Sequence, residues 1–236
     1  MEQSDVPTRR PRKTTNMLQQ RLRYIFFIAL GAAAYFLLKQ TPIGWSVLYP
    51  FRLLATIMHE FGHGSFAILT GGDIMKMQIN TDGSGWTQTM GGSELLILMG
   101  GYVGSAIFGN LLLRAGLVHA QWSNVVLNIL LFIMIAISTI WSASIGNTIF
   151  VAAFALAVYI IGRLHSEVAS WFLIAMGSLS ILHIIEDFNV GPMSDLSHFA
   201  ALLPILPTRG WMFVWLGIVI AITWWNVKGI LLRTEN

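Results

Sequence analysis

The 236-residue chain contains no cysteine, which excludes disulfide bonds and zinc sites built on thiolate ligands. It also has few charges: 11% of its residues are charged, against about 25% in soluble domains, and 55% are hydrophobic. So few polar groups could not cover so much apolar surface in water. The composition therefore excludes one large soluble domain and predicts an all-α, polytopic membrane protein that lies in a lipid bilayer.

Positive charge is unevenly placed along the chain. Residues 1–23 contain six of its fourteen basic residues and two of its eleven acids. By the positive-inside rule this bias predicts a cytoplasmic N-terminus, and because no basic folded face follows, we expect no nucleic-acid partner. We interpret residues 1–20 as a disordered basic cytoplasmic tail and residues 21–236 as a single membrane-embedded domain. A tail without the marks of a transit peptide favours a bacterial inner membrane.

Long apolar segments predict six to seven transmembrane helices, each of which needs about 20 residues. They cover residues 24–38, 43–70, 94–113, 123–141, 147–164, 168–187 and 210–227. Pro50 and Arg52 are expected to interrupt the second segment, and the stretch 193–206 is a candidate re-entrant segment. Four tryptophans in the last segment are typical of interfacial anchors: Trp211, Trp215, Trp224 and Trp225.

A polar stretch at residues 73–92 interrupts the apolar pattern. Its first half partly alternates between apolar and polar residues, and residues 81–85 have the composition of a turn. We therefore expect a small β-hairpin, which would lie near the active site because it directly follows the helix that carries the motif described next.

The apolar helix predicted over residues 53–69 carries the sequence His59-Glu60-Phe61-Gly62-His63. On a helix, His59 and His63 project from one face and can bind one metal ion, and imidazole suits zinc. Glu60 then lies close enough to take a proton from a water activated by zinc. Ionisable residues in an apolar span are costly unless they act together. The sequence therefore predicts a Zn²⁺ site with Glu60 as general base, and a polar cluster that merely pairs helices is the alternative.

A catalytic zinc site needs a third protein ligand. We favour Asp195, since it follows a glycine- and proline-containing backbone break that can expose a carboxylate to a cavity. Ser194 is suited to cap a short helix over residues 195–203. Asp187 is the alternative third ligand, and Glu186 is the next candidate after it.

Three blocks of the chain carry a recognisable pattern. They are residues 54–64 running on to 70–72, residues 83–87 followed by 98–104, and residues 191–196. In these blocks the chain resembles the site-2 protease class of intramembrane zinc metalloproteases, peptidase family M50, and most closely its M50B-like branch. The resemblance implies a zinc metalloendopeptidase in which His59, His63 and Asp195 bind Zn²⁺ and Glu60 is the general base.

The resemblance also implies a substrate and its mode of binding. The substrate would be a transmembrane helix of another membrane protein, cleaved in or near the bilayer, with the 73–92 hairpin holding the unwound segment as an added strand. Asn189 would support the transition state, although it lies closer to Asp195 here than in better-known members. A catalytically silent zinc-binding scaffold or chaperone is the alternative function, and a transporter with a polar pathway is a third.

Overall fold

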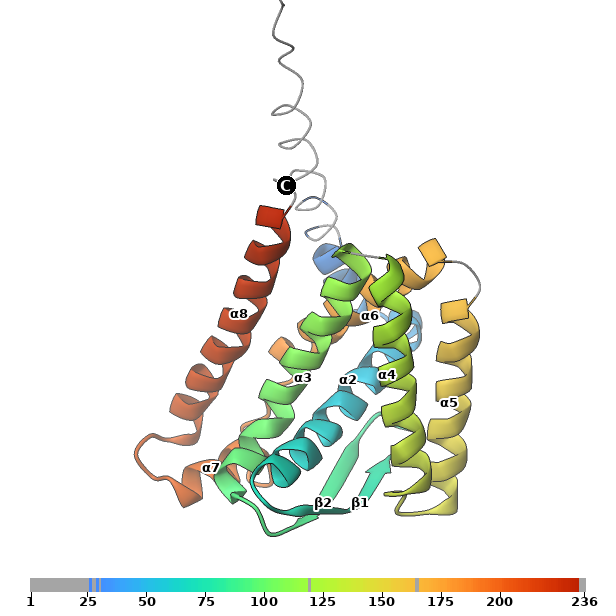
Figure 1. The fold of residues 1–236 in the computed structure, drawn as a ribbon. Coiled ribbons are helices and arrows are strands. Elements are labelled where there is room, and N and C mark those ends of the chain that lie inside the picture. Colours follow the sequence, from blue (N-terminus) through green and yellow to red (C-terminus); the bar gives the residue numbers. More distant parts are fainter. Residues whose placement is uncertain (1–25, 27–28, 30, 119, 164–165, 234–236) are drawn as a thin grey trace, which may run out of the picture.

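A computed structural model describes residues 26, 29, 31–118, 120–163 and 166–233 (Figure 1). Its elements are α2 (Pro42–Leu69), β1 (Asp73–Ile79), β2 (Gly85–Met90), α3 (Glu94–Val118), α4 (Ala120–Thr139), α5 (Ile145–Arg163), α6 (Ser166–Glu186), α7 (Asp195–Leu202) and α8 (Thr208–Arg233). Residues 31–38 are also helical. The predicted tail at residues 1–20 and most of the first half of the predicted span 24–38 lie outside the described residues.

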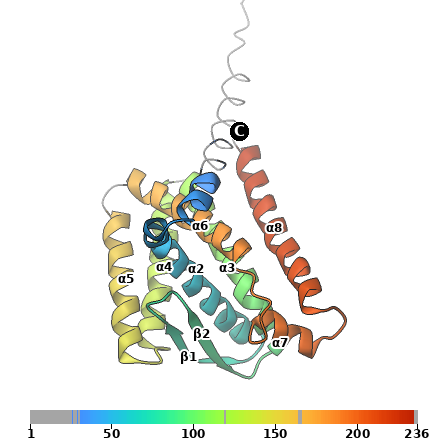
Figure 2. The same cartoon turned by 180° about the vertical axis from the view of Figure 1, so that it is seen from behind.

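Helix α2 is the central element, with α3 against one side and the hairpin across the other (Figures 1 and 2). It begins where the Thr41 side chain accepts a hydrogen bond from the Gly44 N–H, and Pro42 occupies its first turn. The predicted interruption at Pro50 was wrong, because α2 runs through this residue as one helix. A proline there removes one backbone hydrogen bond, but the contacts on both sides of α2 keep the helix continuous.

Glycines set how closely the neighbours approach α2. A Cβ atom on Gly62 would lie 2.4 Å from the carbonyl oxygen of Gly100 in α3, and one on Gly104 would lie 2.8 Å from the Gly62 Cα. On the other side, a Cβ on Gly64 would lie 2.5 Å from the Ile74 side chain of β1. The small residues therefore let α2 contact α3 backbone to backbone and the hairpin almost as closely.

The two strands form the predicted hairpin, and their outer edges differ. β1 pairs with β2 in antiparallel fashion, and on its other side the Met77 N–H and carbonyl bond to the backbone of Trp141 and Ala143. The Asn147 side chain adds hydrogen bonds to the Met77 carbonyl and the Ile79 N–H, at 3.1 and 2.8 Å. The α4–α5 loop thus covers the edge of β1. In the described part of the chain no backbone group bonds to the outer edge of β2.

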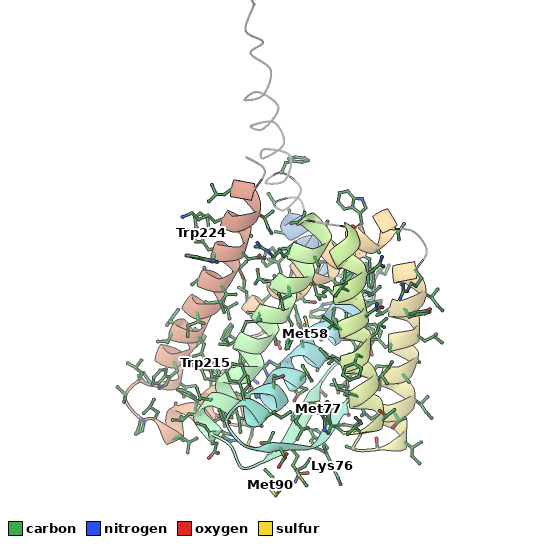
Figure 3. The ribbon with its side chains drawn as sticks, in the orientation of Figure 1. Met58, Lys76, Met77, Met90, Trp215 and Trp224 are labelled. Carbon is green, nitrogen blue, oxygen red and sulfur yellow. The ribbon has the colours of Figure 1, made fainter. Side chains whose placement is uncertain are left out.

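The tryptophans of α8 fall into two groups. Trp224 and Trp225 are 68% and 79% exposed, as anchors would be. Trp215 was predicted to be an anchor, and this prediction was wrong: its side chain is 1% exposed and lies on the side of α8 toward α3 (Figure 3). It packs against Tyr102 and Phe199. This aromatic cluster joins α8 to α3 and α7.

Three of the described helices are long and apolar enough to cross a membrane, as predicted for a mainly helical membrane protein. They contain the spans Glu94–Leu117, Val168–Glu186 and Thr208–Ile230, and two further apolar helical stretches are shorter, at Ser123–Ile137 and Ile145–Ile161. α2 is long but is not among the three. The count of six to seven spans therefore stays a prediction.

Candidate metal centre

Two elements far apart in the chain bring three ligand-type side chains together. His59 and His63 lie one turn apart on α2, and Asp195 is the first residue of α7. The two Nε2 atoms are 3.0 Å apart, and the Asp195 Oδ2 atom lies 3.1 Å from His59 Nε2 and 3.3 Å from His63 Nε2. All three donor atoms therefore point at one small space.

The size of this space fits a metal ion. Zinc bound tetrahedrally at 2.0–2.2 Å holds its ligand atoms about 3.4 Å apart, close to the three separations found here. Gly101 of α3 forms the wall of the space: a Cβ atom there would lie 2.6 Å from the Nε2 atoms of both histidines. Because residue 101 is a glycine, the space next to the two Nε2 atoms is not filled by a side chain.

Neighbouring groups fix how the histidine rings are turned. His63 Nδ1 lies 2.7 Å from the carbonyl oxygen of Ile97, which can only accept a hydrogen bond. Nδ1 therefore carries the proton, and Nε2 keeps its lone pair for a metal. The ring of His59 packs edge-on against Tyr102, with the ring centres 4.8 Å apart.

Glu60 is buried next to the two histidines and is bound by the hairpin. Glu60 is only 6% exposed. The hydroxyl of Thr87, on β2, lies 2.8 Å from Glu60 Oε2 and 3.0 Å from the Glu60 carbonyl oxygen. Gly85 allows this approach, since a Cβ there would lie 2.8 Å from the Glu60 side chain. The Glu60 carboxylate is thus held in the cavity that contains the metal centre, by a strand that sequence reasoning had placed only nearby.

The position of Asp195 depends on the backbone before it. As predicted, Ser194 caps the short helix, accepting a hydrogen bond from the Ser197 N–H. Further back, the Tyr102 hydroxyl accepts a hydrogen bond from the Asn189 N–H at 3.2 Å and donates one to the Asp187 carbonyl at 3.4 Å. Tyr102 therefore contacts both the ring of His59 and the segment that leads to Asp195.

The other candidate ligands lie elsewhere. Asp187 and Asn189 line the same cavity as the metal centre but are not in the group of donor atoms. Glu186 points to the helix at residues 31–38, where it accepts a hydrogen bond from Tyr35 and pairs with Lys39. The Asn189 side-chain oxygen accepts a hydrogen bond from Gly191.

A cavity of about 840 Å³ contains the metal centre and reaches past it along β2. Its wall is formed by the face of α2 that carries the two histidines, by β2 with its flanking turns, by the N-terminal part of α3, and by the segment between α6 and α7.

Sequence reasoning gave no role to three residues that form part of the site: Thr87, Gly101 and Tyr102. All three lie in the blocks that carry the family resemblance, but their roles depend on how α3 and β2 approach α2. Only the cluster of glycines at residues 100–104 gave a signal, since such clusters indicate close helix packing.

The comparisons with known proteins give one match. A family model described as Peptidase M50B-like matches residues 27–226, which is most of the chain and includes every residue of the candidate metal centre. No curated protein and no solved structure matches the sequence. The match covers both the helix that carries the histidine motif and the aspartate that meets it. The chain therefore belongs to the M50B-like peptidase family.

Proposed function

We propose that this chain is an intramembrane zinc metalloendopeptidase that hydrolyses peptide bonds in or near the transmembrane segments of other membrane proteins. One observation carries the proposal. Two histidines and an aspartate enclose a space of metal size beside a buried glutamate, and Gly101 keeps that space open. A site that served structure alone would need no base next to it, so Glu60 favours catalysis over a silent scaffold or chaperone.

His59, His63 and Asp195 would hold Zn²⁺. Zinc in such a site supplies Lewis acidity, which makes water a stronger acid and polarises a carbonyl group. Glu60 then accepts a proton from the attacking water and passes it to the leaving amine. Thr87 keeps the carboxylate oriented toward the metal centre by donating a hydrogen bond to Oε2. Asn189 would add transition-state support from the cavity wall.

The substrate would bind as an extended strand on β2. A helix shields its own amides, so the segment to be cut must unwind, and an edge strand can then pair with its backbone. The covered edge of β1 leaves β2 as the edge that can pair, and β2 also lines the cavity and carries Thr87. The proposed setting is a bacterial inner membrane with the basic tail in the cytoplasm.

The first test is the zinc content of the purified protein and of two variants, His59→Ala and Asp195→Ala. We expect about one zinc per chain in the wild type and a loss in both variants. Glu60→Gln should keep its zinc and lose the cleavage of a membrane-protein substrate. Zinc that survives Asp195→Ala would move the third ligand to Asp187. Zinc-loaded wild type that cleaves no more than Glu60→Gln would favour the scaffold.

A further inference from the structure

A second charged group lies on the face of α2 that carries the motif. Arg52 precedes His59 by seven residues, about 10 Å along the helix, and Arg52, Thr56 and Glu60 are spaced so that they share one face. Its Nε atom is buried and has no hydrogen-bond partner among the described residues. None of the ion pairs in the described part of the chain includes its guanidinium group. Burying such a donor without an acceptor is costly.

The surroundings of Arg52 hold the guanidinium group in place. It lies over the ring of Trp45, 4.1 Å from its centre. The turn of the hairpin sits beside it, because Tyr49 donates a hydrogen bond to the Thr81 carbonyl and Thr56 donates one to the Gly83 carbonyl, at 2.7 and 2.6 Å. The arginine is therefore fixed where β2 begins.

Two acids near Arg52 have hydrogen-bond partners of their own. Asp82, in the hairpin turn, accepts hydrogen bonds from the backbone N–H and the hydroxyl of Ser84 at 2.8 and 2.7 Å, and these bonds hold the pKa of Asp82 below its usual range. Glu186 pairs with Lys39 and Tyr35. Neither acid forms an ion pair with Arg52, although the Arg52 charge contributes to the lowered pKa of Asp82, so the guanidinium group can still bind a carboxylate from outside this arrangement.

We propose that Arg52 binds an acidic side chain of the substrate, so that the peptidase selects segments with Asp or Glu at a fixed distance from the bond it cuts. This rests on the proposed function. A carboxylate can take two parallel hydrogen bonds from the two terminal nitrogens of a guanidinium group, and Nη2 of Arg52 lies beside Gly83 of the hairpin turn. A strand paired with β2 runs from Thr87, at Glu60, to the turn at Gly83, about 13 Å away. The acidic residue would therefore lie about four residues from the scissile bond.

The test uses the full-length Glu60→Gln protein in detergent micelles, which can bind peptides without cutting them. The probe is a pooled library of apolar peptides that carry one Glu, Gln or Lys at each position in turn, with retention read by mass spectrometry. We expect retention of Glu peptides about tenfold above their Gln counterparts at one position, the value of one charge-assisted pair. Adding Arg52→Glu should reverse the preference to Lys, while adding Arg163→Glu, the same charge change on the exposed end of α5, should leave it intact.

Equal retention of Glu and Gln peptides on the protein that keeps Arg52 would overturn the proposal, as would a preference that survives Arg52→Glu. The same binding experiment in nanodiscs with and without anionic lipid identifies a lipid phosphate as the occupant: if anionic lipid abolishes the preference, Arg52 binds the membrane and not the substrate. A preference for Glu in a protein whose wild type cuts nothing would support the binding of an acidic side chain by Arg52 but would overturn the proposed peptidase activity. Cleavage that depends on Glu60 but shows no preference for Glu in the substrate would support the peptidase activity and overturn the role of Arg52.

Discussion

Replacing Gly101 by alanine should remove the metal while leaving the fold. The new Cβ atom would lie 2.6 Å from His59 Nε2 and His63 Nε2. Ordinary contact begins at about 3.4 Å, so each ring would have to retreat by about 0.8 Å. Metal–ligand distances tolerate only about 0.2 Å. The methyl group would also fill the space in which an ion bound to both nitrogens must sit.

We therefore expect Gly101→Ala to weaken zinc binding by at least about 100-fold, more than the loss of a typical supporting hydrogen bond would cause. Zinc per chain after purification and competition with a coloured chelator would measure this. Two matched variants serve as controls. Gly217→Ala in α8 places its Cβ in open space, and Gly100→Ala meets the Phe66 ring at 2.8 Å, with Phe66 and not a histidine as its nearest neighbour. Both should keep their zinc.

The result that refutes this reasoning is a folded Gly101→Ala protein with one zinc per chain and wild-type affinity. The metal would then lie on another side of the histidines, away from α3. If Gly101→Ala loses both its zinc and its helical circular dichroism, the cause is disrupted helix packing and not a blocked metal site. Gly100→Ala should then show the same loss. Zinc retained in Gly100→Ala and lost in Gly101→Ala separates the two explanations.

Three further variants test single contacts. Thr87→Val removes the hydrogen bond to Glu60, so kcat should fall about tenfold with zinc content unchanged, whereas Thr87→Ser should retain most activity. Tyr102→Phe keeps the ring against His59 but loses the bonds to the segment before Asp195, and zinc affinity in a chelator titration should fall up to about tenfold. Asn147→Leu leaves the Ile79 N–H unpaired and removes one of the two hydrogen bonds to the Met77 carbonyl, so it should lower the free energy of unfolding by about 2 kcal/mol, measured by denaturation in detergent; an unchanged value would mean that the Asn147 side chain does not hold the strand.

Local patterns were enough to predict the elements that carry the site. The spacing of His59 and His63 requires a helix, and the alternation and turn residues at 73–92 require a hairpin; both are present. Ser194 was recognised as a helix cap because capping is decided within four residues. The choice of Asp195 over Asp187 used the backbone break before it, and the structure brings Asp195 to the histidines.

Contacts between distant segments could not be predicted in the same way. The pairing of Thr87 with Glu60 spans 27 residues and depends on how far β2 lies across α2. Trp215 looked like a membrane anchor because tryptophan is common at interfaces, but the aromatic pair it meets lies on α3 and α7. Pro50 is a strong helix breaker in isolation, yet packing on both faces of α2 outweighs one lost hydrogen bond.

The glycines of α2 and α3 explain why the metal centre lies where these helices meet. Each glycine inside a helix costs about 1 kcal/mol relative to alanine, and the two helices place Gly62, Gly100, Gly101 and Gly104 at their contact. A larger residue at Gly62 or Gly104 would hold the backbones apart, and one at Gly101 would put a side chain into the space beside His59 and His63. The same approach brings the Ile97 carbonyl within reach of His63 Nδ1. The glycines lower the helix propensity of α2 and α3, but the close contact they allow orients the two imidazole rings and leaves space for a metal ion beside their Nε2 atoms.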